Sequence, residues 1–182
     1  MLARTLVTPR LRLEATTPAH ADGLWTATQS SLPQLLVYMA WAPQASPENA
    51  RSYAERVARR FDESIDWSFT IFHDHEVAGA ISLMNYEAMF KVAEIGYWIR
   101  SDLAGRGLAT EAARAVCDFG FDEARLHRIE LRAWVENPAS IRIAEKLGFT
   151  REGLLREASW AQAGYQDMYI YGLLESDRKA AK

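Results

Sequence analysis

The sequence has little cysteine: Cys117 is the single one among 182 residues. One cysteine forms no internal disulfide and no cysteine-rich metal site, and we expect Cys117 to be a small buried residue rather than a nucleophile. No apolar run approaches about 18 residues, so no membrane-spanning helix is expected. The first ten residues lack the apolar core of a secretory signal. These absences favour a cytoplasmic protein without membrane contact.

An excess of positive charge is also missing. The formal net charge is −3, which does not suit direct nucleic-acid binding. Hydrophobic residues make up 49% and charged residues 25% of the chain, as in ordinary globular proteins. The length suits one domain, which we assign to residues 1–175, with residues 176–182 as a charged and frayed tail.

Hydrophobic periodicity predicts the element order β-α-α-β-β-β-α-β-α-β-β. A strand over 91–99, a helix over 108–124 and a strand over 128–135 form a β-α-β unit, whose strands must be parallel. Residues 32–45 are predicted to be irregular, and a turn is expected at 161–164. The fold class is therefore α/β (α+β), with a mixed, mostly antiparallel sheet of about six or seven strands and helices on both faces.

Two histidines, His73 and His75, stand between two predicted strands. A zinc site needs about four ligands, and no third ligand lies nearby in the sequence. A polar trio between strands is typical of a hairpin loop, so we predict a loop and no metal.

Gly105 and Gly107 directly precede the predicted helix. They suit a turn, or an anion site, because free N–H groups at a helix N-terminus attract phosphate and glycine leaves room for it. A dinucleotide-binding turn would have a third glycine at position 110, where Thr110 stands, and an apolar strand before the loop rather than one carrying Glu94. The pattern therefore disfavours a nicotinamide dinucleotide.

The combination of "GRGLATEA" (105–112) with "NPASIRIAEKLGF" (137–149) resembles the GNAT superfamily of acyl-CoA-dependent N-acyltransferases, and within it the RimJ/RimL-like branch. The resemblance also includes other segments, from "TPRLRLEATT" to "DMYIYGLL", and so covers about residues 8–174. The resemblance implies a GNAT fold with a splayed parallel strand pair and acetyl-CoA as co-substrate.

The resemblance also implies roles for individual residues. The loop would cradle the pyrophosphate, the strand before it would pair with the pantetheine arm, and the start of the later helix would contact that arm. Ala104 stands where the family often has Gln or Arg, so that side-chain contribution is lost; Arg106 adds charge or points to solvent. The residues assigned to acetyl-CoA are Trp98, Ile99, Arg100, Ala104, Gly105, Arg106, Gly107, Leu108, Ala109, Thr110, Asn137 and Ser140.

Catalysis is assigned by resemblance to Glu94 as general base, acting through water, and to Ser140 as proton donor to the leaving thiolate. The alternatives are an exposed strand carboxylate with proton loss to solvent, and a serine that only begins a helix. Asn137 either contacts the pantetheine arm, caps the helix, or does both. Some relatives carry a late-strand Glu where Ser159 stands here.

The implied acceptor is a protein N-terminal α-amine, attacked directly in a ternary complex of a monomer or homodimer. A small amine (amino acid, polyamine or antibiotic) is the alternative acceptor, and an inactive acyl-CoA-binding module is the alternative function. Aromatic residues are expected to form the acceptor wall, namely Tyr38, Trp41, Tyr86, Trp160 and Tyr165.

Overall fold

The computed structural model describes residues 2–161 and 164–180. Its strands are β1 (Thr5–Val7), β2 (Arg12–Ala15), β3 (Trp67–His73), β4 (Glu76–Glu87), β5 (Val92–Ile99), β6 (Arg128–Trp134), β7 (Thr150–Ala161) and β8 (Gly164–Leu174). Its α-helices are α1 (Ala21–Tyr38), α2 (Pro47–Asp62), α3 (Leu108–Asp122), α4 (Pro138–Lys146) and α5 (Glu175–Ala180). Short 3-10 helices are η1 (Pro18–His20), η2 (Ala42–Gln44) and η3 (Ser101–Leu103).

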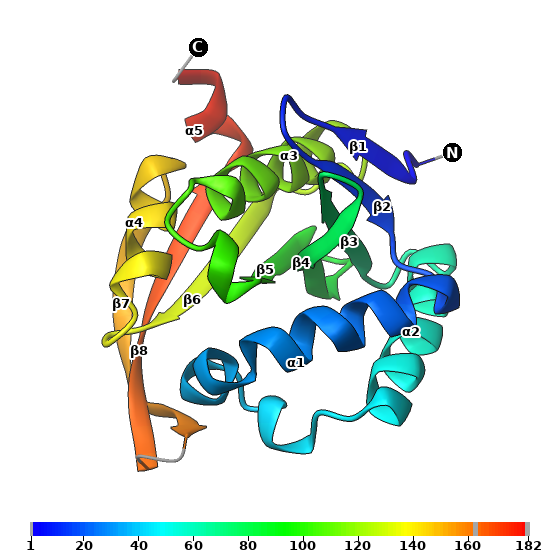
Figure 1. The fold of residues 1–182 in the computed structure, drawn as a ribbon. Coiled ribbons are helices and arrows are strands. Elements are labelled where there is room, and N and C mark those ends of the chain that lie inside the picture. The colour runs from blue at the N-terminus through cyan, green and yellow to red at the C-terminus, as the bar shows by residue number, and fades with distance from the viewer. Residues whose placement is uncertain (1, 162–163, 181–182) are drawn as a thin grey trace.

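All eight strands form one sheet in the order β1-β2-β3-β4-β5-β6-β8-β7. β5 and β6 pair in parallel, and the other neighbours pair antiparallel. Helices α1 and α2 lie on one side of the sheet, and α3 and α4 lie on the other (Figure 1). The predicted class, the helices on both faces and the parallel pair are confirmed, but the sheet has eight strands rather than six or seven.

Local signals explain where the helices around the site begin and end. Ser46 caps α2 by accepting a hydrogen bond from the Asn49 N–H at 3.1 Å, and Asn137 caps α4 in the same way. After α4, Gly148 adopts a φ of +82°, the left-handed conformation that ends a helix and favours glycine. Asn137 and Gly148 therefore fix the two ends of α4, the helix that follows β6.

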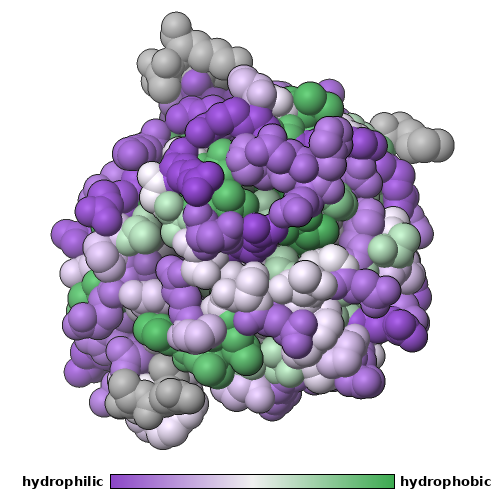
Figure 2. Space-filling model, in the orientation of Figure 1, coloured by the Kyte–Doolittle hydropathy of each residue, from purple (hydrophilic) through white to green (hydrophobic). Residues whose placement is uncertain are grey.

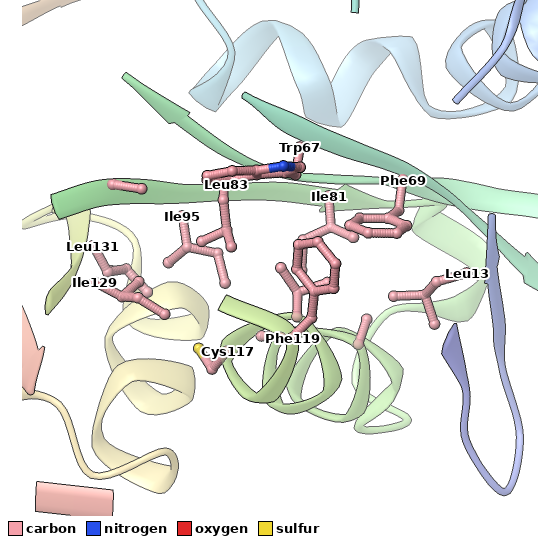
Figure 3. Close-up of a cluster of buried hydrophobic side chains, with 14 of the residues drawn as sticks. Leu13, Trp67, Phe69, Ile81, Leu83, Ile95, Cys117, Phe119, Ile129 and Leu131 are labelled. Atoms are coloured by element: carbon pink, nitrogen blue, oxygen red, sulfur yellow. The ribbon is translucent and has the colours of Figure 1, made fainter. Parts of the chain in front are cut away.

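The main core lies between the sheet and α3. Phe119 of α3 packs edge-on against Phe69 at 5.2 Å between ring centroids, and Trp67 is 6.2 Å away (Figure 3). Cys117 lies beside them, and burial raises the pKa of its thiol to about 12. A thiol that stays protonated and buried is not a nucleophile, which agrees with its predicted structural role.

Three segments differ from the sequence prediction. Residues 32–38 belong to α1 rather than to an irregular segment, with Pro33 inside the helix. A three-residue strand, β1, was not predicted, and its short pattern gives little periodicity. The predicted frayed tail forms α5 up to Ala180, where Arg178 donates two hydrogen bonds to Asp122 at 2.6 Å.

The predicted turn at 161–164 falls partly on residues 162–163, which lie outside the described residues. Within the described chain, none of the helices is long and apolar enough to cross a membrane. Figure 2 shows that hydrophilic side chains cover most of the face seen in Figure 1, while apolar ones gather near the C-terminal part of α1.

Candidate active site

The site begins where β5 and β6 separate. The two strands pair over three residues each, Val92–Glu94 with Arg128–Glu130. Beyond that point β5 continues along β4 and β6 continues along β8. A cleft of about 1320 Å³ lies at this gap, lined by residues of both strands, of α1, α2 and α4, and of the loop before α3. The predicted splayed pair thus forms the floor of a large cleft.

Strand alternation decides which groups of β5 face the gap. The N–H of Arg100 donates to the carbonyl of Ala78 on β4 at 2.7 Å. Because backbone groups of a strand point alternately to its two neighbours, those of Trp98 also face β4, whereas those of Tyr97 and Ile99 face the gap. Of the three strand residues predicted to pair with the cofactor, Ile99 is therefore the one whose backbone is turned toward the gap.

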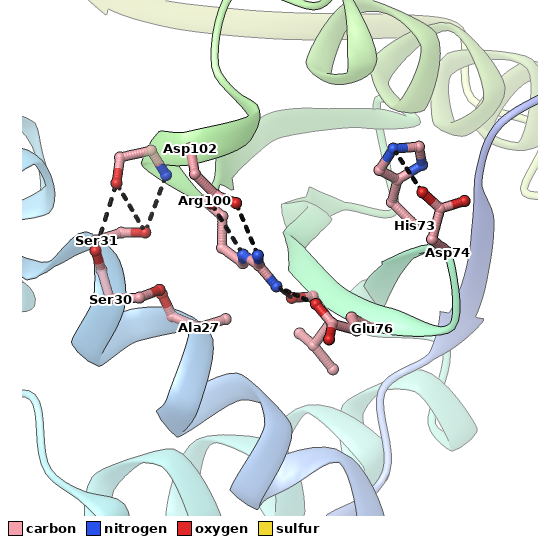
Figure 4. A network of polar contacts seen from close by, with 10 residues as sticks. Ala27, Ser30, Ser31, His73, Asp74, Glu76, Arg100 and Asp102 are labelled. Carbon is pink, nitrogen blue, oxygen red and sulfur yellow. Dashed lines mark hydrogen bonds and ion pairs between the residues drawn. The ribbon is translucent and has the colours of Figure 1, made fainter.

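Arg100 is not among the residues that line the cleft. Its guanidinium donates to Asp102 at 3.0 and 2.8 Å and to Glu76 at 2.9 Å, as Figure 4 shows. The next residue, Ser101, donates its N–H to Ser31 Oγ of α1 at 3.0 Å. These bonds fix the end of β5, so Arg100 contributes to the shape of the site, and its contact with acetyl-CoA stays a prediction.

The loop over residues 104–107, called the glycine loop below, forms one end of the cleft. Gly105 and Gly107 have φ angles of +77° and +79°, which favour glycine. The first N–H of α3 bonded to a backbone carbonyl is that of Glu111, which donates to Gly107 at 3.0 Å. The preceding N–H groups of the first helical turn are available to an anion at the positive end of the helix. They belong to Leu108, Ala109 and Thr110, which line the cleft.

Ala104 lines the cleft with the glycines, so its backbone is in place although it has no polar side chain. Arg106 is exposed and is not among the lining residues. The contact of Arg106 with acetyl-CoA therefore stays a prediction.

Asn137 and Ser140 meet at the start of α4. Asn137 Oδ1 accepts a hydrogen bond from the Ser140 N–H at 3.1 Å, which is the capping role. Both residues line the cleft. The cap orients the first turn of α4 and with it the hydroxyl of Ser140, so capping and ligand contact are compatible.

Tyr97 is a site residue that the sequence analysis missed. Its hydroxyl lies 3.0 Å from Ser140 Oγ. Burial raises the pKa of Tyr97 to about 12, against the opposing effect of the Ser140 hydrogen bond, so the phenol stays protonated at neutral pH. The two-residue alternation from buried Ala93 and Ile95 was the available signal, because it places Tyr97 on the face of the sheet that α3 and α4 cover.

Glu94 lines the cleft from the opposite face of β5. Its Oε2 accepts a hydrogen bond from Asn85 at 3.3 Å and lies 3.6 Å from Arg132 Nε. A carboxylate side chain at this position in the cleft is a candidate general base. Acid and base candidates therefore approach the gap from its two sides.

The predicted aromatic wall is only partly present. Tyr38 lines the cleft and packs edge-on against Trp134 at 5.8 Å, and Trp41 lies 6.2 Å from Trp98. Tyr86 instead packs against the core, because Asn85 has a φ of +55° and a bulge interrupts the alternation of β4 there. The other two predicted residues, Trp160 and Tyr165, are exposed and contact each other at 4.9 Å, away from the cleft lining.

A hairpin turn joins β3 and β4, as predicted; it consists of Asp74 and His75, and His73 is the last residue of β3. Among the described residues, no group of three or more histidine, cysteine, aspartate or glutamate side chains could hold a metal ion.

Comparison with known proteins agrees with this geometry. Residues 10–150 match the family model described as "Acetyltransferase (GNAT) domain". The chain is 31% identical to the uncharacterized N-acetyltransferase p20 of Bacillus licheniformis, covering 95% of this chain and 97% of that protein. It is 29% identical to the ribosomal-protein-serine acetyltransferase of Escherichia coli (strain K12), covering 91% and 93%.

Among solved structures, RimL, a ribosomal L7/L12 alpha-N-protein acetyltransferase in complex with coenzyme A, superposes with a TM-score of 0.90. It is 24% identical and the match covers 93% of this chain and 97% of that one, which establishes a shared fold. With the match of most of its length to the family model, the chain belongs to the GNAT acetyltransferases and is an acyl-CoA-dependent N-acetyltransferase with acetyl-CoA as co-substrate.

Proposed function

We propose that the chain acetylates the N-terminal α-amine of a protein, by direct attack of the amine on the thioester in a ternary complex. The observation that carries the proposal is the arrangement across the gap, with Glu94 on one face and the Tyr97–Ser140 pair on the other. Named relatives support the acceptor class, since one is a ribosomal-protein-serine acetyltransferase. A ribosomal acceptor would place the enzyme in the cytoplasm.

Each residue has a defined task in this mechanism. Glu94 accepts the proton of the attacking amine, directly or through water, and the gap-facing N–H groups of Tyr97 and Ile99 stabilise the carbonyl oxygen as negative charge develops on it. When the C–S bond breaks, Ser140 donates its hydroxyl proton to the sulfur while it takes a proton from solvent. Tyr97 Oη lies 3.0 Å from Ser140 Oγ, and we propose that Tyr97 is the donor of this hydrogen bond, which leaves the Ser140 proton free to point into the gap.

The charge of the cleft argues against a polyamine acceptor. Arg56, Arg132, Arg142 and Lys146 line the cleft, against the carboxylate of Glu94. A polycation would be repelled by this lining, whereas a peptide with one α-amine, neutral or acidic in sequence, would not. An α-amine also has a pKa near 8, well below about 10.4 for lysine, so modest base assistance is enough.

The test is acetyl-CoA turnover, followed by thiol release, on peptides that differ only at the amine. We expect acetylation of free serine or alanine N-termini, and none of the same peptides with a blocked N-terminus and an internal lysine. Turnover on spermidine or free lysine but not on peptides would contradict the acceptor. Tight binding of acetyl-CoA without turnover on any amine would contradict the enzymatic proposal altogether.

A further inference from the structure

The loop between β1 and β2 reaches the start of α3, about a hundred residues later in the sequence. Thr8 Oγ1 donates to Glu111 Oε1 at 2.6 Å, and the Arg10 backbone N–H donates to the same oxygen at 3.0 Å. Arg10 Nε donates to Glu111 Oε2 at 2.7 Å. Both carboxylate oxygens of Glu111, in the first turn of α3, are thus engaged by one short segment.

Arg10 also holds the glycine loop itself. Its Nη1 donates to the carbonyl of Arg106 at 2.9 Å. That carbonyl belongs to the residue between Gly105 and Gly107, the two residues with the greatest backbone freedom. A loop with two glycines loses more conformational entropy on ordering than other loops, so a fixed carbonyl at its centre reduces the cost of ordering it around a ligand.

The charge of Glu111 requires compensation at this position. A free carboxylate in the first turn of α3 would compete with a phosphate for the positive end of the helix. Burial acts to raise the pKa of Glu111, but the hydrogen bonds from Thr8 and Arg10 outweigh it and lower the pKa, so the carboxylate is ionised. Arg10 neutralises that charge at a distance of 2.6 Å.

We propose that Thr8, Arg10 and Glu111 form a clamp that holds the glycine loop in the conformation that accepts the pyrophosphate of acetyl-CoA. Arg10 is a positioning residue in this clamp, because its guanidinium is bonded to Glu111 and to the loop carbonyl. The proposal concerns the acyl donor and is independent of which amine is the acceptor.

The first measurement is the calorimetric Kd of coenzyme A for Arg10→Gln and for a matched control, Arg12→Gln. Arg12 lies two residues along, pairs with Glu14 at 2.7 Å, and is 63% exposed. We expect Arg10→Gln to raise the Kd of coenzyme A about tenfold. A change of this size corresponds to the entropy cost of ordering one loop residue. Arg12→Gln should bind as the unmodified protein does, and equal weakening in both variants would overturn the clamp.

Glu111→Gln separates a clamp from direct contact of Arg10 with phosphate. If the clamp holds the loop, losing its carboxylate weakens coenzyme A. If Arg10 instead binds phosphate and Glu111 competes for it, the same change tightens binding, which would refute the proposal. Thermal unfolding of each variant shows that it is folded at the temperature of measurement.

A shortened acyl donor tests whether Arg10 acts at the pyrophosphate. A variant that only destabilises the fold would affect the long and the short donor equally. Acetyl-pantetheine has the same thioester and lacks the pyrophosphate. We expect Arg10→Gln to raise the KM for acetyl-CoA about tenfold and to leave the kcat/KM for acetyl-pantetheine within about twofold. Equal losses for both donors would overturn the assignment of Arg10 to the pyrophosphate end.

Discussion

Replacing Tyr97 with phenylalanine removes one hydroxyl group from the cleft and keeps the aromatic ring at position 97. The lost contact is the 3.0 Å hydrogen bond to Ser140. A neutral hydrogen bond of this kind is worth about 1 kcal/mol, which corresponds to about fivefold in rate. We expect Tyr97→Phe to lower kcat by about that factor with the KM for acetyl-CoA within about twofold. Ser140→Ala, which removes the proton donor, should lower kcat about a hundredfold.

The assay is thiol release at saturating acetyl-CoA, with Tyr171→Phe as control, because Tyr171 is buried on β8 and does not line the cleft. If Tyr97 acts only through Ser140, the double variant Tyr97→Phe/Ser140→Ala is no slower than Ser140→Ala alone. Because burial raises the pKa of Tyr97 to about 12, its protonated form persists to pH 10 and kcat should not fall there through its ionisation. Additive losses, or an alkaline fall near pH 10 that disappears in Tyr97→Phe, would refute this mechanism.

Other predictions concern the base, the loop and the core. Glu94→Gln should lower kcat about a hundredfold at pH 7 and less at pH 9, where the acceptor amine is already deprotonated; an unchanged rate would favour proton loss to solvent. Gly107→Ala should weaken coenzyme A in calorimetry, because a φ of +79° costs a residue with a Cβ about 1–2 kcal/mol. Phe119→Ala should lower the free energy of unfolding by about 3–5 kcal/mol in urea, and a loss below 1 kcal/mol would contradict its central place in the core.

The donor side of the site could be predicted from sequence because it depends on local signals. Glycines before a helix predict an anion site, and Asn-Pro predicts a helix start. The structure places Gly105, Gly107 and Asn137 at the cleft, as these signals indicate. The parallel strand pair followed from a single β-α-β unit, which allows only that pairing.

The remainder depends on contacts that no local pattern encodes. The bond from Arg10 to Arg106 joins positions 96 residues apart. The prediction that Tyr86 lines the cleft is wrong for a reason that periodicity does not reveal. Asn85 has a positive φ, which turns the side chains that follow it to other faces of the sheet. Residues 32–38 were predicted to be irregular, yet they belong to α1 with Pro33 inside the helix, where packing of the helix on the sheet outweighs one lost backbone hydrogen bond.

The two ends of the cleft are built by different means, and this explains why sequence reveals the donor more readily than the acceptor. In the site that we propose, acetyl-CoA meets backbone N–H groups at Ile99 and in the first turn of α3, which require glycines and a helix start but few particular side chains. The acceptor end that we propose is formed by cleft-lining side chains from α1, α2 and the segment between them, such as Tyr38, Trp41 and Arg56. Their charge and aromatic content determine which amines bind, so substitutions there should change the acceptor while the Kd of coenzyme A is retained.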